Sequence, residues 1–557
     1  SLSSSFEPFS VLRAFQTMSS VVQPVCAFQR SYRVSAALQS FGRLHRWVAT
    51  SSPSSKLAFS RGSLSRGVLV QSRRAFRATK PATMPATTAL FGGIRKALGG
   101  SASGGTTIAA STATFSDNAP SWEMLAEMVA AQRLELGAPE PDHVDGPTNA
   151  FSLRRTFGQP GEPLVKFYRD HASWCPYCEK IWLQLEEKKI PYIVEKINMS
   201  CYGEKPRSFL AIAPGGSLPV MELDGRVLTE SAVIASELER KFPSNNPLMP
   251  PKGTDLHQAA EGLMRLERTL FSRWMGWLTS GRSDKENQQM FEEALDVVDE
   301  ELARRKGPYF LGKELSLVDI TFTPFLERMV ASMAYYKGMR MLGTGRWPHL
   351  EKWFAAMDSR PTYRGMKSDF YSHCHDLPPQ LGGCASNKDG PKLAASIDGT
   401  DDASWHLPLP PLTATSLEPI YYKETPALDR LEAAAKLVTN HAKAARFAAR
   451  GCGQKGSPPV RAPLADPNAK PGDQFVPAVD AALRHVAHAM LAGVDTVQTS
   501  AKFQLQVNGE GGGGPPVAPV TPSVEYLRDR VGVPRDMGYP AARQFRAHLN
   551  WFIDQTN

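Results

Sequence analysis

The sequence predicts three successive folded regions: a small mixed α/β domain, an all-α domain and a further region that is mainly α-helical. Between about 161 and 243, short apolar runs alternate with stretches of helical periodicity, as expected of a mixed α/β domain. From 254 to 375, and again from 419 to 557, apolar residues recur mainly at helical spacing. The chain length of 557 residues also exceeds that of a single domain.

Residues 1–116 differ in composition from the rest of the chain. They hold fourteen Lys or Arg residues against one acidic residue, Glu7, and they are rich in Ser and Ala. This composition is typical of an organellar transit peptide, and a disordered basic tail that stays attached is the alternative. Composition alone does not separate a plastid leader from a mitochondrial one.

The remainder of the chain is close to neutral, although the whole chain carries a formal net charge of +9. A near-neutral body argues against a nucleic-acid partner. We find no run of about 18 apolar residues, and therefore expect no transmembrane segment. The seven cysteines are scattered over a long chain, which does not suggest a disulfide framework.

Residues 117–160 are expected to form one helix and a linker. The helix would run from Trp122 to Leu134 with Ser121 as its N-cap, and its apolar stripe would pack on a neighbouring domain. A loop rich in proline and glycine follows from Pro139 to Pro147.

The elements expected within 161–243 have the order of a thioredoxin-like domain. Alternating or apolar runs predict strands at Leu164–Tyr168, Tyr192–Ile197, Leu218–Leu223 and Arg226–Leu228. Asp224-Gly225 between the last two strands is a strong hairpin signal. Helical spacing predicts helices at Cys178–Lys189 and Glu230–Lys241, the latter with Val233, Ile234 and Leu238 facing inward. Pro206–Ile212 is expected to be a short helix or a turn.

Helical periodicity continues from Leu256 to about Met366, with a capping box at Ser316–Asp319 ahead of an apolar run. Residues 376–418 are polar and rich in proline, so we expect a linker there. The last region, 419–557, is expected to be a mainly helical extension of unknown role. Its helices are predicted near 426–449, 474–506 and 522–556, with a flexible loop at Gly509–Pro519.

The sequence Trp174-Cys175-Pro176-Tyr177-Cys178 stands between a predicted strand and a predicted helix. Pro176 has the fixed φ that is favoured at the first helical position. Cys175 would therefore lie at a helix N-terminus, where free N–H groups and the helix dipole stabilise a thiolate. A second cysteine three residues later can resolve a mixed disulfide. This arrangement predicts thiol redox chemistry.

Two other interpretations of Cys175 and Cys178 remain open, half of a zinc site and an inert structural pair. A structural zinc site needs two more ligands, and the other cysteines form no second C-x-x-C. Cys374 with His373 and His375 is a local cluster, but it lies far along the chain. We therefore expect no metal.

Over about Pro163–Met366 the chain resembles the glutathione transferase family. The resemblance rests on the C-P-Y-C motif, on Gly216–Pro219, on Thr229–Ser231 and on the capping box. It implies a thioredoxin-like glutathione-binding domain at 161–243 and a helical transferase C-terminal domain at 254–375. The double-cysteine motif and the long extension look like the iota class of photosynthetic organisms, which implies a chloroplast leader and leaves the mitochondrion as the alternative.

The resemblance also implies roles for individual residues. Cys175 would be the attacking thiolate and Cys178 an optional resolving cysteine. Glutathione, as co-substrate, would be held by six further residues: Tyr177, Lys205, Leu218 through its backbone, Pro219 with a cis bond, Glu230 and Ser231. For Lys205 a solvated lysine is the simpler interpretation, and Tyr177 could merely shape the turn. Trp174 could line an acceptor pocket or belong to the core, whereas core is favoured for Trp274 and Trp277.

The predicted function is glutathione-dependent thiol transfer, by removal of glutathione from mixed disulfides or by related disulfide or dehydroascorbate reduction. The alternative is a non-catalytic scaffold or ligand-binding protein that acts through its C-terminal extension. A homodimer, or a protein partner bound by the extension, is also possible. His485 and His488 could hold a metal or haem, but packed or solvated histidines are favoured.

The C-terminal segment is both apolar and basic. Its apolar residues could dock on the transferase body or on a partner. Its arginines are Arg528, Arg530, Arg535, Arg543 and Arg546. A solvated face with salt bridges to Asp529 and Asp536 is favoured over a site for an anionic ligand.

Overall fold

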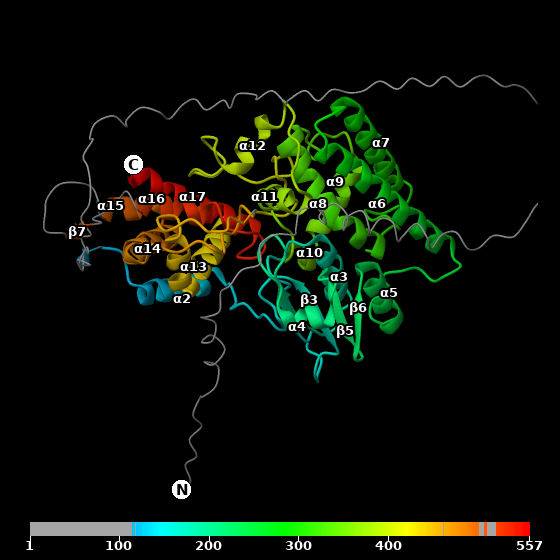
Figure 1. Ribbon diagram of the computed structural model, residues 1–557, viewed down its shortest axis with the longest axis horizontal. Coiled ribbons are helices and arrows are strands. Elements are labelled where there is room, and N and C mark those ends of the chain that lie inside the picture. Colours follow the sequence, from blue (N-terminus) through cyan, green and yellow to red (C-terminus); the bar gives the residue numbers. More distant parts are fainter. Residues whose placement is uncertain (1–113, 117, 461, 501–505, 509–519, 557) are drawn as a thin grey trace, which may run out of the picture. The chain divides into compact units, whose positions relative to one another are not determined.

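The structure is a computed structural model that describes residues 114–116, 118–460, 462–500, 506–508 and 520–556 (Figure 1). Nearly all of the predicted leader, and the predicted loop Gly509–Pro519, lie outside these residues. Strand β1 (Thr114–Ser116) pairs antiparallel with β7 (Gln506–Asn508). Among the described helices, none has the length and apolar character needed to cross a membrane.

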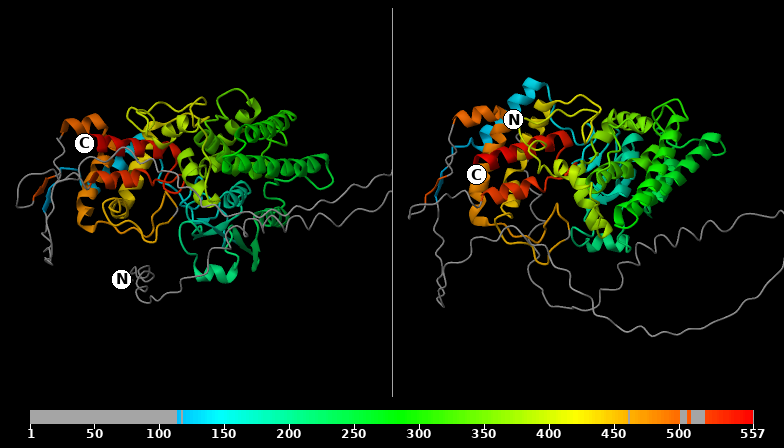
Figure 2. Two further views of the ribbon diagram at one scale, coloured as in Figure 1. Left: turned by 45° about the horizontal axis from the view of Figure 1, so that its top comes forward. Right: turned by 90° about the horizontal axis from the view of Figure 1, so that it is seen from above.

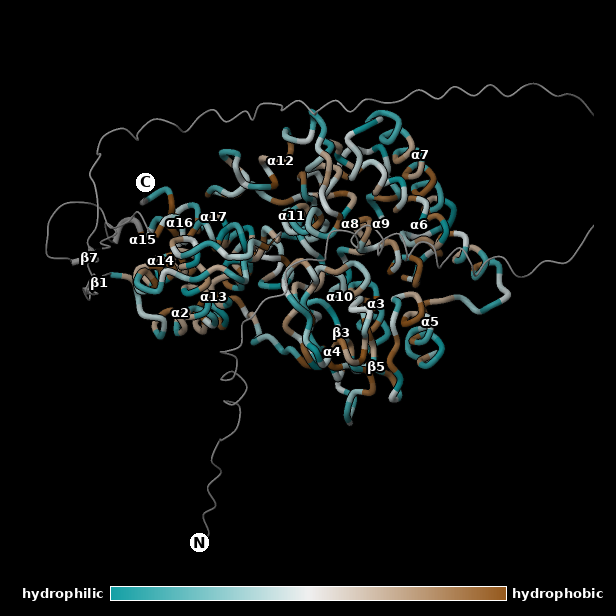
Figure 3. Tube along the Cα trace, in the orientation of Figure 1, coloured by the Kyte–Doolittle hydropathy of each residue, from teal (hydrophilic) through white to brown (hydrophobic). Residues whose placement is uncertain are grey.

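A five-stranded mixed sheet forms the α/β domain. Its strand order is β2 (Arg154–Arg155), β4 (Tyr192–Ile197), β3 (Val165–Asp170), β5 (Val220–Leu223) and β6 (Arg226–Thr229). Strands β3 and β4 are parallel and the other pairs are antiparallel. Hydrophobic residues, shown in brown in Figure 3, predominate along β5. The predicted thioredoxin-like sheet is therefore confirmed.

Helices cover both faces of this sheet, because successive strand residues point to opposite sides. Phe167 belongs to the core formed with α3 (Pro176–Glu187) and α5 (Ser231–Lys241). Its neighbour Tyr168 packs on the other face against Phe209 of α4 (Arg207–Ile212). Strand β3 therefore buries side chains on both faces of the sheet, against α3 and α5 on one face and against α4 on the other.

The prediction that Val233 faces inward is wrong. In α5 the buried residues are Ile234 and Leu238, whereas Val233 is 53% exposed. Adjacent helical residues point about 100° apart, so Val233 turns away from the sheet when Ile234 faces it.

The helical domain consists of α6 (Asp255–Thr279), α7 (Asp284–Ala303), α8 (Leu317–Lys337), α9 (Pro348–Asp358), α10 (Pro361–Arg364) and α11 (Phe370–Leu381). Helix α8 is buried along almost its whole length and packs against α3, α6 and α11. The predicted capping box is present: the Asp319 carboxylate accepts hydrogen bonds from the Ser316 N–H at 2.9 Å and hydroxyl at 2.6 Å. Trp274 and Trp277 are buried in the core, as favoured.

The segment 376–418, expected to be a linker, is more ordered than the sequence suggested. Helix α11 continues to Leu381, and α12 (Pro391–Asp398) packs against α8. Ile397 and Trp405 are buried, so this proline-rich segment contributes apolar side chains to the core of the helical domain.

A second core is formed by the C-terminal helices and α2 (Trp122–Leu136). The C-terminal members are α13 (Pro426–Ala448), α14 (Val476–Ala492), α15 (Val494–Ser500), α16 (Val520–Arg528) and α17 (Tyr539–Thr556). Ser121 caps α2 as predicted, by accepting a hydrogen bond from the N–H of Met124. The indole of Trp122 donates to Asp480 at 2.8 Å and stacks on His441. Helix α2 therefore completes the C-terminal bundle, and every view shows it beside those helices (Figure 2).

Two of the long helices predicted in the extension are each divided. Gly493, with φ of 89°, separates α14 from α15. A non-helical segment that includes Gly532 and Pro534 separates α16 from α17. Glycine accepts a positive φ without strain, and proline lacks the N–H that a helix requires.

The segment between α16 and α17 is joined to the start of α11 by hydrogen bonds. The hydroxyl of Tyr371 donates to the carbonyl of Asp529 at 3.0 Å, and the N–H of Val533 donates to the hydroxyl of Ser372 at 3.1 Å. Arg546 of α17 forms an ion pair with Asp369 at 2.6 Å, and both side chains are buried. The C-terminal segment thus docks on the helical domain of the same chain, at the start of α11.

The favoured interpretation of the five arginines as a solvated face is correct only in part. Arg528 and Arg535 pair with their neighbours Asp529 and Asp536, as expected. In contrast, Arg546 is buried, and so is Arg543, which pairs with Glu424 at 3.3 Å and donates to a backbone carbonyl. The sequence could not reveal these partners, since they lie more than a hundred residues away.

Candidate active site

One edge of the sheet gathers the predicted site residues. Strands β3 and β4 are parallel, so their carboxyl ends lie at this edge. The pairing of Tyr168 with Val220 places Pro219 beside the end of β3. The pairing of Val220 with Thr229 places Glu230 at the same edge. The peptide bond between Leu218 and Pro219 is cis, as predicted.

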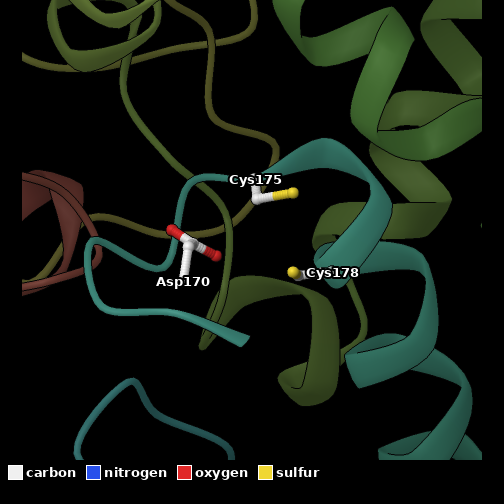
Figure 4. A group of neighbouring side chains, drawn as sticks. All are labelled: Asp170, Cys175 and Cys178. Atoms are coloured by element: carbon white, nitrogen blue, oxygen red, sulfur yellow. The ribbon is translucent and has the colours of Figure 1, made fainter. Parts of the chain in front are cut away.

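Cys175 lies directly before α3, in the N-cap position, and Pro176 is the first residue of that helix. The Cys175 side chain is half-buried, whereas Cys178, one turn later, is buried. Their sulfur atoms and a carboxylate oxygen of Asp170 all lie within 4.8 Å of one another (Figure 4). The positive end of the α3 dipole favours a negative charge on Cys175.

The two thiols differ in their environment. Burial, the hydrogen bond with Cys175 and the nearby Asp170 carboxylate raise the pKa of the Cys178 thiol well above its usual range. Cys178 is therefore a neutral thiol at physiological pH. Because a thiolate is the nucleophilic form of cysteine, the neutral and buried Cys178 thiol is poorly suited to attack, and Cys175 is the more accessible of the two side chains.

Asp170 is a site residue that the sequence analysis did not single out. It is the last residue of β3 and is buried, and its Oδ2 atom accepts a hydrogen bond from the N–H of Trp174 at 2.7 Å. Its Oδ1 atom has no hydrogen-bond partner among the described residues. A carboxylate at the end of an apolar strand, five residues before the motif, was the available signal.

The three side chains Asp170, Cys175 and Cys178 form the one convergent group of potential metal ligands within the described residues. The cluster of His373, Cys374 and His375 adds no fourth ligand to it. His375 bonds to Asp398 at 2.8 Å, and the thiol of Cys374 donates to the carbonyl of Ala331. These consecutive residues of α11 point in different directions and do not converge.

The remaining predicted residues lie on α3 itself and on other elements. Ser231 is the first residue of α5, and Glu230 before it is exposed with a φ of 66°. The ammonium group of Lys205 donates to the carbonyl of Asn198 at 2.7 Å, and burial lowers its pKa. The Tyr177 ring is partly exposed and contacts Phe325 of α8 edge-on. The free N–H groups at the start of α5 favour an anionic group there.

Comparison with known proteins now identifies the region that carries this site. Residues 174–241 match the model for the glutathione S-transferase N-terminal domain, and residues 285–356 match that for the C-terminal domain. We refer to residues 161–375 as the transferase region.

Two relatives align with this region. Glutathione S-transferase DHAR2 of Arabidopsis thaliana is 29% identical over 163 residues, which cover 29% of this chain and 70% of the relative. Chloroplastic glutathione S-transferase DHAR3 of the same plant is 31% identical over 163 residues, covering 29% of this chain and 58% of that relative. Glutathione transferase Omega 3C from Trametes versicolor, a solved structure, is 23% identical with a TM-score of 0.32, covering 45% of this chain and 92% of that structure.

Within the transferase region, Arg328 of α8 connects the helical domain to the active-site loop. Its guanidinium donates to Glu179 of α3 at 3.0 Å and to the carbonyl of Trp174, the residue before Cys175. It also stacks on the Trp174 ring, 4.6 Å from the centroid. The Trp174 indole donates to His373 of α11 at 3.0 Å. Trp174 is therefore a buried anchor of the loop, which resolves its two possible roles in favour of the core.

Replacing Arg328 with methionine is expected to lower stability and to slow reaction at Cys175. Loss of charged hydrogen bonds inside the protein costs about 2–3 kcal/mol. Burial and the nearby charge of Glu327 raise the pKa of Glu179 well above its usual range, so Glu179 can take up a proton when its partner is lost. Urea unfolding measures the first effect, and iodoacetamide alkylation of Cys175 in a Cys178→Ser background measures the second.

Arg304→Met is the matched control for Arg328→Met, because Arg304 at the end of α7 is exposed and pairs with Glu301, three residues before it. Its loss should cost less than about 1 kcal/mol. Arg328→Lys, which keeps one charged contact, should fall between the two. If folded Arg328→Met protein is alkylated as fast as the unaltered protein, Arg328 has no positioning role.

Proposed function

We propose that this chain is a glutathione-dependent thiol transferase of the cysteine type. The observation that carries the proposal is the contrast between half-buried Cys175 at the N-terminus of α3 and fully buried Cys178, whose pKa is raised. The match to both glutathione S-transferase domains supports glutathione as the co-substrate. The whole chain's activity and substrates are part of this proposal.

In the proposed reaction, the Cys175 thiolate attacks the glutathione sulfur of a mixed disulfide. A disulfide between Cys175 and glutathione forms as the old S–S bond breaks, and the substrate leaves as a thiolate, which takes a proton from water. A second glutathione thiolate then attacks the glutathione sulfur of this intermediate. Glutathione disulfide leaves and the Cys175 thiolate is restored. The helix N-terminus stabilises Cys175 both as attacking and as leaving group.

Reduction of dehydroascorbate is included in the proposal. In the overall reaction, two glutathione thiols supply two electrons and two protons and become glutathione disulfide, while dehydroascorbate becomes ascorbate. A glutathione thiol can regenerate the same Cys175 site in either reaction. Conjugation of electrophiles is less compatible with the site, since it needs glutathione held as a free thiolate, whereas Cys175 takes glutathione from a mixed disulfide into a disulfide with itself.

We assign the binding of glutathione to residues at the sheet edge. The backbone of Leu218, beside the cis bond to Pro219, would pair with the tripeptide backbone. Glu230 and Ser231 would hold its γ-glutamyl end, where the start of α5 favours a carboxylate. Lys205 would bind the glycine carboxylate. Tyr177 would donate from a neutral phenol, because burial and the charge of Cys175 raise its pKa to about 12.

The finer classification is also proposed. The C-P-Y-C motif together with a long helical extension supports a cysteine-type transferase resembling the iota class. A plastid location, with the mitochondrion as the alternative, rests on the basic leader, and DHAR3 of Arabidopsis thaliana is among the relatives named as chloroplastic. No metal has a role in this mechanism.

Mass spectrometry of the intact protein tests the proposal. The full chain, reduced and then exposed briefly to glutathione disulfide, is expected to gain one glutathione at Cys175, and an excess of glutathione should remove it. Turnover of a glutathione mixed disulfide should accompany this exchange. A folded protein that neither forms the adduct nor turns over would favour the scaffold or ligand-binding alternative.

A further inference from the structure

One cavity of the C-terminal region has a volume of about 580 Å³, and no residue of the Cys175 motif is among its lining residues. It is bounded by α13, by the segment 464–471 and by residues 527–545, and Phe151 contributes from the N-terminal side. Cavities of about 300–1,000 Å³ are typical of small-molecule sites. Nothing in the proposed thiol transfer uses this cavity.

The lining combines an apolar interior with an excess of positive charge. Leu437, Leu527, Val531, Met537 and Phe545 are buried apolar members of the lining. Six basic side chains also line it, against a single acidic one: Lys436, Lys443, Arg446, Arg450, Arg530 and Arg535, with Asp536 as the acid. Long basic side chains place their apolar stems along such a surface while the charged ends meet a polar group.

Four of these six basic residues have local partners. Arg535 is neutralised by Asp536 at 2.7 Å and Arg446 approaches Asp473 at 3.4 Å, while Arg450 and Arg530 donate to backbone carbonyls at 3.1 Å and 3.2 Å. Lys436, Lys443 and Arg530 have no carboxylate within ion-pair distance in the part of the chain that the structure describes.

Lys436 and Arg530 are held close to apolar and aromatic surface. The Lys436 ammonium lies 3.4 Å from the centroid of the Phe151 ring, and burial lowers its pKa. The Arg530 guanidinium lies 3.6 Å from the Tyr526 ring centroid, and its Nε atom is buried without an acceptor. Poorly solvated cations beside an apolar cavity favour a ligand that supplies negative charge.

We propose that this cavity binds an amphipathic anion, namely a chain-like apolar molecule with one carboxylate head group. The apolar lining would take the chain, and Lys436 and Arg530 would bind the carboxylate. A nucleotide or sugar fits less well, because such ligands need many polar contacts and this lining offers mainly cations and apolar side chains. The site is separate from the glutathione site, so the proposal does not depend on thiol transfer.

Isothermal titration calorimetry of the full chain with decanoate tests this site. Decanoate should bind, and each methylene removed should weaken binding by about threefold to fourfold, so hexanoate should bind far more weakly. Decan-1-ol, which has the chain without the charge, should bind at least about tenfold more weakly than decanoate. Raising the salt from about 0.05 M to about 0.5 M should weaken decanoate but not decan-1-ol.

Variants locate the binding. The double variant Lys436→Met/Arg530→Met should weaken decanoate at least tenfold and leave decan-1-ol unchanged. Ala444→Phe, which places a larger side chain in the cavity, should weaken the binding of both ligands. The control Lys352→Met, an exposed lysine on α9, should have no effect. Thermal unfolding of each variant establishes that it is folded.

The proposal is overturned if decan-1-ol binds as tightly as decanoate, or if neither binds. It is also overturned if folded Ala444→Phe protein binds decanoate normally. Salt dependence in the unaltered protein keeps the charge requirement testable even if the double variant does not fold.

Discussion

Replacement of Cys175 by serine is expected to reduce glutathione-dependent turnover to the uncatalysed rate. A serine hydroxyl at this position is not ionised and forms no disulfide, so neither half of the reaction can proceed. Replacement of Cys178 should retain activity within about tenfold, equal to ~1.4 kcal/mol in the barrier. Steady-state reduction of a glutathione mixed disulfide by each full-length variant measures both effects.

Cys201→Ser is the matched control, because Cys201 is also half-buried but lies outside the motif. It should leave turnover unchanged. If Cys178→Ser is as inactive as Cys175→Ser, the reaction is a dithiol cycle, and the optional role given to Cys178 is wrong. If Cys175→Ser keeps full activity, Cys175 is not the nucleophile.

Replacement of Arg546 by methionine is expected to destabilise the protein by about 3–5 kcal/mol, because it leaves a buried carboxylate without its cation. Arg546 and Asp369 are 1% and 0% exposed and lie 2.6 Å apart. The same guanidinium also donates to the carbonyl of Val531 at 2.9 Å and stacks on the rings of Tyr371 and Trp405. Urea unfolding of the full chain measures the change in the free energy of unfolding.

The double variant Arg546→Met/Asp369→Asn should recover part of the lost stability, since no charge is left unpaired. Recovery should be incomplete, because Asp369 also caps α11 by accepting from the N–H of Ser372 at 2.9 Å. The exposed pair of Arg446 with Asp473 is the matched control, and Arg446→Met should cost less than about 1 kcal/mol. A loss for Arg546→Met no larger than the control would show that this pair does not hold the C-terminal helices in place.

Local patterns predicted much of the transferase region. The strand Tyr192–Ile197 has the predicted bounds, and the capping box at Ser316 is present. The Ser121 cap outside this region is also present, as is the cis bond at Pro219 that the resemblance implied. Each of these features depends on residues that are close in sequence. Motif chemistry likewise pointed to Cys175 without any knowledge of the tertiary structure.

Partners that meet only through tertiary packing were not predictable. Arg328 and His373 contact Trp174 from positions 154 and 199 residues away, and no periodicity of the sequence links them. Asp170 is near the motif, but only the fold shows that its carboxylate lies beside both thiols. The burial of Arg546 was missed for the same reason, since an arginine-rich segment resembles a solvated surface until its carboxylate partner is located.

The membership of α2 in the C-terminal bundle has a consequence for synthesis on the ribosome. Trp122 can form its hydrogen bond only after Asp480, 358 residues later, has been synthesised. At 5–20 residues per second, synthesis of that stretch takes about 20–70 s. Gln132 waits for Leu491 over a similar span. During that time the transferase region can fold, while α2 exposes apolar residues that have no place to pack. Helix α2 therefore stays without these packing partners until α14 has been synthesised.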